Sequence, residues 1–222
     1  MDDAKCNSVA VLASGGIDSA VLTAQLSKQY AAVFPIFVRS GLRWEEDELL
    51  HLRKYLGAVA GPTFRPLRVF ELPVQDIYGD HWGLTGRCVP DADTADEAVY
   101  LPGRNLLLIS KVAVWCALNS VGTLALGSLG GNPFSDSTPE FDRSFEVLVQ
   151  RGLGTSVLIT RPFASLSKVD VLRRGQMLPL ELTFSCINPV SGGHCGRCNK
   201  CAERRRGFQH AGIRDMTAYA YG

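Results

Sequence analysis

The chain has 222 residues, of which 46% are hydrophobic and 20% are charged, a composition that excludes disordered, collagen-like and low-complexity proteins. Its 23 basic and 22 acidic residues leave a formal net charge of +1, which predicts neither a nucleic-acid partner nor a membrane partner. No apolar signal sequence opens the chain, and its longest nearly apolar run, residues 106–118, falls short of the ~20 residues that span a bilayer. We therefore expect a soluble, cytoplasmic protein.

Short apolar runs alternate with amphipathic stretches along most of the chain. Strands are expected at residues 9–12, 32–38, 64–72, 123–126 and 157–160, and helices near Asp18, Glu45, Asn105, Thr138 and Ser167. Asn105 and Thr138 are the expected N-caps of their helices, and Ser167 with Asp170 resembles a capping box. This alternation is typical of a doubly wound α/β fold with a mostly parallel sheet. Ligands of such folds bind beyond the carboxyl ends of the strands, where loops 14–16 and 127–132 lie.

The domain organisation follows from two changes in composition. Residues 73–103 are rich in Gly, Pro and acidic residues, which indicates a surface loop or a lid inserted in the domain. Residues 181–222 contain four clustered cysteines. We therefore expect an α/β nucleotide-binding domain over residues 1–180 and a metal-binding segment over residues 181–222.

A glycine-rich loop, Ser14-Gly-Gly-Ile-Asp-Ser19, joins the first expected strand to the first expected helix. Glycine allows the backbone to approach a phosphate closely, and a helix N-terminus offers free N–H groups with partial positive charge. No Gly-Lys-Ser/Thr string occurs in the chain, so the loop is not a Walker A motif. It predicts a phosphate site of another type, in which Asp18 is either an acid stabilised by the helix dipole or a ligand of Mg²⁺.

The four cysteines Cys186, Cys195, Cys198 and Cys201 are the strongest chemical signal in the sequence. Two successive Cys-x2-Cys steps in a reducing compartment indicate a metal site rather than disulfides. A closed tetrahedral zinc site and an iron–sulfur cluster both accept four thiolates. The neighbouring arginines, including Arg204, are expected to offset the negative charge of the cluster, and His194 is expected to be a solvated loop residue.

Taken in order, several motifs resemble those of the 7-cyano-7-deazaguanine synthases, a family of PP-loop, N-type ATP pyrophosphatases. The motifs are Ser14–Ser19, Tyr100-Leu-Pro-Gly-Arg-Asn105, Ser167-Lys168, Ser185-Cys186 and Cys195-Gly-Arg-Cys-Asn-Lys-Cys201. The resemblance implies an adenine nucleotide α-hydrolase-like fold and favours zinc in a structural role. It also implies that ATP and ammonia convert 7-carboxy-7-deazaguanine to a nitrile through an adenylated carboxylate and an amide, in the synthesis of queuosine and archaeosine precursors. ATP, Mg²⁺ and Zn²⁺ are the implied cofactors, and a homodimer without direct nucleic-acid contact is expected.

The resemblance also implies roles for individual residues. Arg104 would neutralise the substrate carboxylate or a phosphate, with Asn105 orienting the substrate, although both residues also suit a helix start. Lys168 would reach the phosphates, unless it is simply a solvated lysine. Asp136 and Glu140 would recognise the guanine edge or hold Mg²⁺, with helix capping as the alternative. The nucleotide-binding set is Leu12, Ala13, Ser14, Gly15, Gly16, Ile17, Asp18, Ser19, Ala20, Val21 and Leu22.

Two loops depart from the family pattern. Residues 39–44 keep only Gly41 and Arg43 of a Tyr-Gly-Gln-Arg-His-like string, and Ser137 and Thr138 stand where Cys and Arg are usual. A related PP-loop amide synthetase or ligase that acts on a deazaguanine carboxylate or on another carboxylate is therefore the alternative function. A non-catalytic nucleotide sensor is a second alternative, from a different class.

Overall fold

Five parallel strands form one sheet in the computed structural model, which describes residues 7–131 and 134–221. The strand order is β3-β2-β1-β4-β5, so the central strand β1 separates the first half of the fold from the second. The strands are β1 (Ser8–Leu12), β2 (Ala32–Arg39), β3 (Arg68–Glu71), β4 (Thr123–Ala125) and β5 (Leu158–Thr160). The expected parallel α/β sheet is confirmed.

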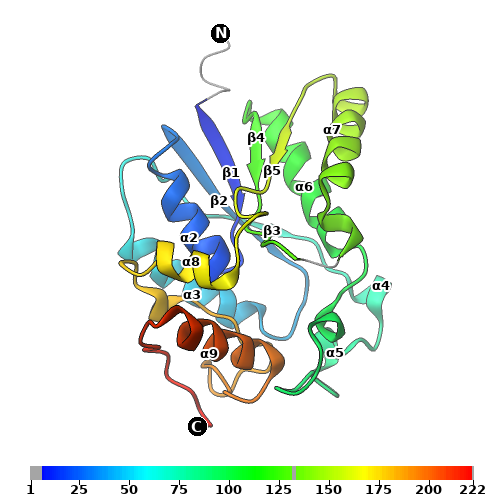
Figure 1. The fold of residues 1–222 in the computed structure, drawn as a ribbon. Coiled ribbons are helices and arrows are strands. Elements are labelled where there is room, and N and C mark those ends of the chain that lie inside the picture. The colour runs from blue at the N-terminus through cyan, green and yellow to red at the C-terminus, as the bar shows by residue number, and fades with distance from the viewer. Residues whose placement is uncertain (1–6, 132–133, 222) are drawn as a thin grey trace.

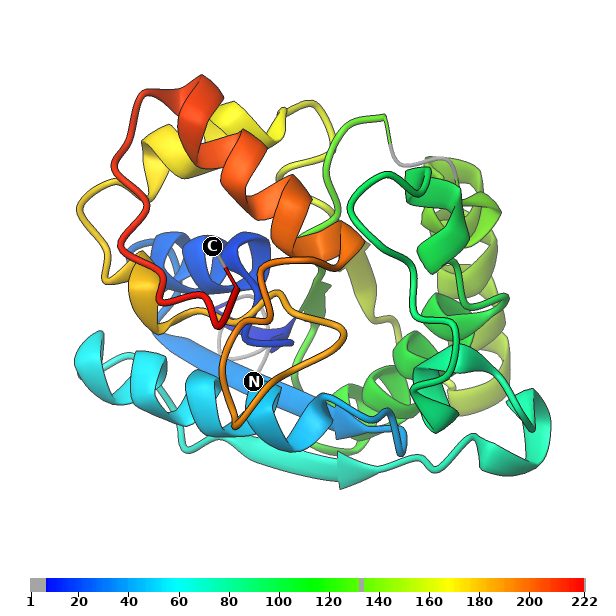
Figure 2. The same ribbon diagram turned by 90° about the horizontal axis from the view of Figure 1, so that it is seen from below.

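Helices cover both faces of this sheet (Figure 1). One face carries α2 (Ile17–Leu26), α3 (Glu45–Ala58), α8 (Lys168–Arg174) and α9 (Asn199–Ala211), with α9 packed on α8 (Figure 2). The other face carries α6 (Arg104–Leu118) and α7 (Pro139–Leu153). The short elements are α4 (Gln75–Tyr78), α5 (Trp82–Thr85) and the 3₁₀ turns η1 (Asp96–Val99), η2 (Ser135–Ser137) and η3 (Leu180–Leu182).

The apolar residues of β1 explain why helices pack on both of its faces. Val9 and Val11 point into the core shared with α2, α8 and α9, whereas Ala10 points into the core shared with α6 and α7. All three side chains are fully buried. A strand covered on both faces needs such a continuous apolar run.

Two expected boundaries are wrong. The strand expected from residue 64 becomes regular only at Arg68, because Pro66 has no N–H to donate to the ladder; Phe64 forms just an isolated bridge with Val33. Helix α6 is capped by Gly103, at φ 74°, and not by Asn105. The positive φ of Gly103 allows the helix to begin at Arg104, which places Asn105 inside its first turn.

Two other expected caps are confirmed. The Thr138 hydroxyl accepts a hydrogen bond from the Phe141 N–H at 3.1 Å and begins α7. Ser167 and Asp170 form a reciprocal capping box at the start of α8. The box fixes the position of Lys168, the first residue of that helix.

The segment expected to be a loop or lid lies against the cysteine-rich segment. The Asn199 backbone N–H donates to the Pro90 carbonyl at 3.0 Å, and its side-chain amide donates to the Thr94 carbonyl at 2.6 Å. Leu101 packs in the same apolar cluster as the four cysteines. A role of this segment as a moving lid stays a prediction. No helix within the described ranges 7–131 and 134–221 is both long and apolar enough to cross a bilayer.

Candidate active site

A cleft of about 600 Å³ lies at the carboxyl ends of β1, β2 and β4. The loop after β1 and the loop after β4 form adjacent parts of its wall. They are in close contact, because a Cβ atom on Gly127 would lie 3.1 Å from the backbone of Asp18 and Ser19. The expectation that both loops line one crevice is confirmed as far as Gly131, since Asn132 lies outside the described residues.

The loop after β1 exposes the N-terminus of α2 to this cleft. Gly15 adopts φ +82°, and a Cβ there would lie 2.9 Å from the Glu48 carbonyl oxygen, so only glycine fits. The Ser14 hydroxyl accepts from the Gly16 N–H at 3.3 Å, and the Ser19 hydroxyl donates to the Gly16 carbonyl at 3.1 Å. Gly16 is the N-cap, and no side chain in the described part of the chain caps α2. The first turn of α2 thus retains N–H groups for an anion.

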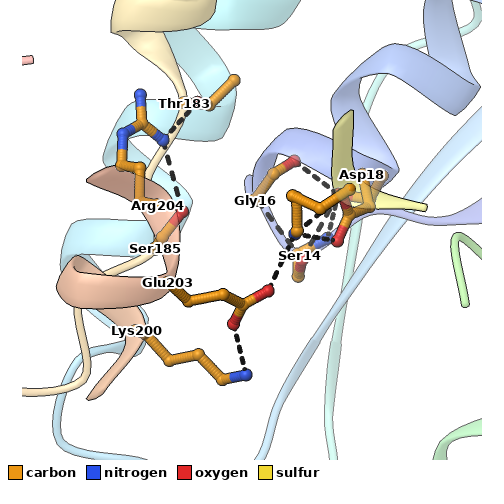
Figure 3. Close-up of polar contacts among 10 residues, drawn as sticks. Ser14, Gly16, Asp18, Thr183, Ser185, Lys200, Glu203 and Arg204 are labelled. Atoms are coloured by element: carbon orange, nitrogen blue, oxygen red, sulfur yellow. Dashed lines mark hydrogen bonds and ion pairs between the residues drawn. The ribbon is translucent and has the colours of Figure 1, made fainter. Parts of the chain in front are cut away.

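A chain of ion pairs joins this loop to α8 and α9. The Lys168 Nζ donates to both carboxylate oxygens of Asp18, at 2.9 and 2.7 Å, and pairs with the Glu203 carboxylate at 3.2 Å. The Lys200 Nζ pairs with the other oxygen of Glu203 at 2.6 Å. Figure 3 shows Lys200 and Glu203 on α9 facing the loop that holds Ser14 and Asp18. All four charged residues line the cleft.

The ion pairs keep this network charged despite its partial burial. Burial opposes ionisation of Glu203, but the attraction and hydrogen bonds of Lys168 and Lys200 outweigh it and lower its pKa to about 2. Burial also opposes the charge on Lys168, and the carboxylates of Asp18 and Glu203 outweigh that effect and raise its pKa. Lys168 and Glu203 are therefore both charged at neutral pH.

Only part of the expected nucleotide-binding set reaches the cleft. Leu12, Ala13, Ser14, Gly16, Asp18 and Ser19 line it. Gly15 does not line the cleft and packs instead against α3. The side chains of Ile17, Ala20, Val21 and Leu22 are instead buried beneath the loop in the protein core.

Arg104 and Asn105 enter the cleft from the opposite side, at the start of α6. The Arg104 Nε is buried and has no hydrogen-bond partner among the described residues. An unpaired buried donor costs ~1–3 kcal/mol, which an anionic ligand would recover. Asn105 donates from its backbone N–H and its side-chain amide to the two carboxylate oxygens of Asp136, both at 3.0 Å.

Asp136 and Glu140 have different environments. Asp136 is buried and caps α6 from a distant part of the chain, so it acts on the cleft through Asn105. Glu140 is exposed on α7, pairs with Arg143 at 2.8 Å and does not line the cleft. The structure thus brings Arg104, Asn105, Asp18 and Lys168 to one cleft and leaves Glu140 outside it.

A buried arginine, Arg161, connects several segments of the cleft wall near Asp136. Arg161 makes a two-pronged ion pair with Asp142, at 2.7 and 2.8 Å, and donates to the hydroxyls of Ser128 and Ser137 at 2.7 and 2.9 Å. It also donates to the Asp136 carbonyl at 3.2 Å. Arg161 therefore links the loop after β4, the turn η2 and helix α7.

Sequence reasoning missed three charged residues that line the cleft, namely Glu48, Lys200 and Glu203. Glu48 extends from α3 and is only partly exposed. Burial raises its pKa to about 8, and the repulsion of Glu45 adds to this rise, against the opposing effects of Arg104 and of a hydrogen bond from Trp44. Two features of the sequence could have pointed to these residues. Glu48 belongs to the acidic start of α3, and Lys200 and Glu203 lie on either side of the expected metal ligand Cys201.

The four expected cysteine ligands converge on one point. Their Sγ atoms all lie within 4.8 Å of one another, and the Cys186–Cys198 and Cys195–Cys201 pairs are 3.9 Å apart. A tetrahedral metal with bonds of ~2.3 Å places its sulfur ligands ~3.8 Å apart. Backbone N–H groups also point at the sulfurs, as from Cys198 to Cys195 at 3.3 Å. The geometry and the donor set fit a metal ion.

The expectation that His194 is solvated is wrong. Its side chain is 2% exposed, and its Nε2 accepts the Ser185 N–H at 3.1 Å. Burial, aided by the nearby charge of Arg204, lowers its pKa to about 3, so it is neutral. Arg204 is itself buried and donates to the Thr183 and Ser185 hydroxyls at 2.9 and 3.2 Å (Figure 3). These contacts anchor α9 beneath the cysteine cluster.

The parallel sheet with helices on both faces and the glycine loop after its central strand place the protein in the PP-loop fold class. Solved structures support the fold. A 4-thiouridine synthetase in complex with RNA and bound ATP is 16% identical and superposes with a TM-score of 0.53, covering 93% of this chain and 51% of that one. The NMN synthetase from Francisella tularensis is 12% identical with a TM-score of 0.50, over 94% of this chain and 79% of that one.

Sequence comparison identifies the family. Residues 8–212 match the family described as "Queuosine biosynthesis protein QueC", and the chain belongs to this family. Proteins named 7-cyano-7-deazaguanine synthase from Xanthomonas campestris pv. campestris (strain B100) and Xanthomonas oryzae pv. oryzae (strain PXO99A) are each 34% identical to it. Both alignments cover 95% of this chain and 96% of the relative. The family resemblance expected from the motifs is thereby confirmed.

Proposed function

We propose that the protein converts 7-carboxy-7-deazaguanine, ammonia and ATP to 7-cyano-7-deazaguanine, by way of an adenylated carboxylate and an amide. The observation that carries this proposal is a cleft with the glycine loop and the N-terminus of α2 on one side and the unpaired Arg104 donor on the other. A carboxylate held by Arg104 would thus lie in the same cavity as the α-phosphate of ATP. The full-length similarity to named synthases supports the same substrate.

The proposed chemistry needs positioning and positive charge more than a protein nucleophile. A carboxylate is a poor acyl donor because its oxygen is a bad leaving group, and transfer of AMP to that oxygen corrects this. Ser14, Gly16 and the first turn of α2 would bind the departing pyrophosphate, and Lys168 would leave Asp18 to balance its charge. Asp18, released from Lys168, would be available to Mg²⁺. Arg104 and Asn105 would orient the deazaguanine carboxylate.

The loop at residues 134–138 bears on the choice of mechanism. Ser137 stands where relatives usually carry cysteine. Its hydroxyl accepts a hydrogen bond from Arg161, and Ser137 is not among the described residues that line the cleft. Adenylation and displacement by ammonia need no covalent bond to this position. The altered loop favours one second candidate, a related amide synthetase that stops before the nitrile.

We assign zinc in a structural role to Cys186, Cys195, Cys198 and Cys201. Four cysteine thiolates at tetrahedral spacing leave no open position for a water or a substrate, which is typical of structural zinc. When bound, the ion would hold the loop of residues 186–198 and the start of α9 together. The nearly neutral net charge supports small-molecule substrates and no direct nucleic-acid partner.

Mass spectrometry of one reaction tests the proposal. The purified protein would be incubated with Mg-ATP, ammonium and 7-carboxy-7-deazaguanine. We expect the amide first and then the nitrile, with AMP and pyrophosphate formed in each round. Amide without nitrile would support the amide synthetase, and no product from a metal-replete sample would reject both.

A further inference from the structure

The proposed amide-forming step releases a proton that the cleft has to accept. When ammonia attacks the acyl carbon, a C–N bond forms, and the C–O bond to AMP then breaks with its electron pair leaving on AMP. The attacking nitrogen loses one proton, because the amide product is neutral. A positioned base accelerates such a step by ~10²–10⁴-fold.

Most charged groups of the cleft are already held in ion pairs with one another. Asp18, Lys168, Glu203 and Lys200 are joined to one another by ion pairs at 2.6–3.2 Å. The guanidinium of Arg104 carries hydrogen-bond donors and no acceptor, so it offers no base. Among the described residues that line the cleft, Glu48 is the remaining acid, and it makes no ion pair with them.

Glu48 contacts the glycine loop and lies near Arg104 in the wall of the cleft. Its backbone carbonyl touches the phosphate loop, since a Cβ on Gly15 would lie 2.9 Å from it. Its side chain lines the cleft together with Gly16 from the loop and Arg104 from α6, and is close enough to Arg104 for their charges to interact. An acyl-adenylate that binds the glycine loop through its phosphate and Arg104 through its acyl end would therefore lie alongside Glu48.

We propose that the Glu48 carboxylate is the catalytic base that takes the proton from the attacking ammonia. This inference rests on the proposed function. The proton passes from nitrogen to Glu48 as the C–N bond forms, and Glu48 then returns it to solvent as AMP leaves. The same carboxylate is placed to take the proton that the amide nitrogen loses when the second AMP departs and the nitrile forms.

The electrostatics of the site suit this role. Burial raises the pKa of Glu48 to about 8, with Glu45 on the same helix adding to the rise, and with Arg104 and the Trp44 indole opposing it. The other charges facing the cleft are Asp18 on α2, Lys168 on α8, and Lys200 and Glu203 on α9. A raised carboxyl pKa means that the base form accumulates as pH rises through about 8. The rate of amide formation, expressed per unprotonated ammonia, should therefore rise over that range.

The test separates adenylation from amide formation in Glu48→Gln. Carboxylate-dependent exchange of pyrophosphate into ATP reports adenylation, and we expect the variant to stay within about twofold of wild type. Amide formation from ammonia should fall ~10²-fold or more, and its rise with pH should disappear. Hydroxylamine is unprotonated at neutral pH and more nucleophilic than ammonia, so hydroxamate formation should stay close to wild type. Glu46→Gln, an exposed acid of the same helix, is the control and should match wild type in all assays.

Three outcomes would overturn the inference. Amide formation by Glu48→Gln within about threefold of wild type would show that no base acts there. An equal loss of exchange and of amide formation would place Glu48 in adenylation or in folding. Retention of the pH dependence would assign the titrating group elsewhere. If wild type itself shows no exchange with 7-carboxy-7-deazaguanine, the proposed function fails, and the base assignment fails with it.

Discussion

Replacing Arg161 with methionine should cost about 3–5 kcal/mol of folding stability, because it leaves the Asp142 carboxylate buried without its partner. The side chains of Arg161 and Asp142 are only 5% and 11% exposed, and two parallel hydrogen bonds join them. Three further donations, to Ser128, Ser137 and the Asp136 carbonyl, are lost with the guanidinium. Arg161→Met keeps much of the apolar volume, so the loss is mainly polar.

Urea unfolding followed by circular dichroism measures this cost. The matched control is Arg143→Met on α7, whose ion pair with Glu140 has partners 67% and 75% exposed; such surface pairs contribute ~0–1 kcal/mol. Removing both members of the buried pair, in Arg161→Met with Asp142→Leu, should cost less than removing Arg161 alone. A cost below about 1 kcal/mol for Arg161→Met, or an equal cost for the control, would refute the reasoning.

Three further outcomes follow from the site. Gly15→Ala should abolish measurable ATP binding in calorimetry, whereas Gly154→Ala, at φ +68° with open space around it, should cost only ~1 kcal/mol of stability and no affinity. Cys201→Ser should lower the metal content measured by mass spectrometry and weaken ATP binding, and retained affinity in metal-free protein would contradict this. Glu203→Gln should cost about 2–3 kcal/mol at pH 7, since its pKa of about 2 lies below 4.5 in the unfolded chain. That difference should persist down to about pH 5 and shrink only as pH falls toward 2. It should be smaller, but not zero, if Lys168 is replaced first, because Lys200 still pairs with Glu203.

Local patterns carried the correct part of the sequence analysis. The glycine loop, the Thr138 cap and the Ser167 capping box involve residues a few positions apart, so their hydrogen bonds are set by backbone geometry alone. Cys195, Cys198 and Cys201 were predictable for the same reason, because their three-residue spacing already brings the thiols close together. The alternation of short apolar runs with amphipathic stretches was enough to predict the parallel sheet.

The remaining features depend on contacts between distant parts of the chain. The Asp136 carboxylate accepts the Asn105 N–H in the first turn of α6 across 31 positions, a contact for which no local signal exists, whereas the local pattern alone predicts Asn105 as the cap. The sequence predicts a solvated His194 because four cysteines already complete the metal site, but its ring packs against Phe184 and Tyr219. Glu48 and Glu203 lie on helices whose cleft-facing sides are decided by packing rather than by periodicity.

Helix α9 connects the cysteine cluster to the cleft. Its N-cap is Cys198 and its first turn contains Cys201, while the intervening Lys200 and the adjacent Glu203 point into the cleft. A helical turn is rigid, so any displacement of the cysteine loop moves both charged residues relative to Lys168 and Asp18. A metal that fixes the thiolates therefore also fixes the ion-pair network that faces the phosphate loop. A bound ion would act on the proposed chemistry through position alone, so a closed, four-cysteine site is compatible with an effect of the metal on activity.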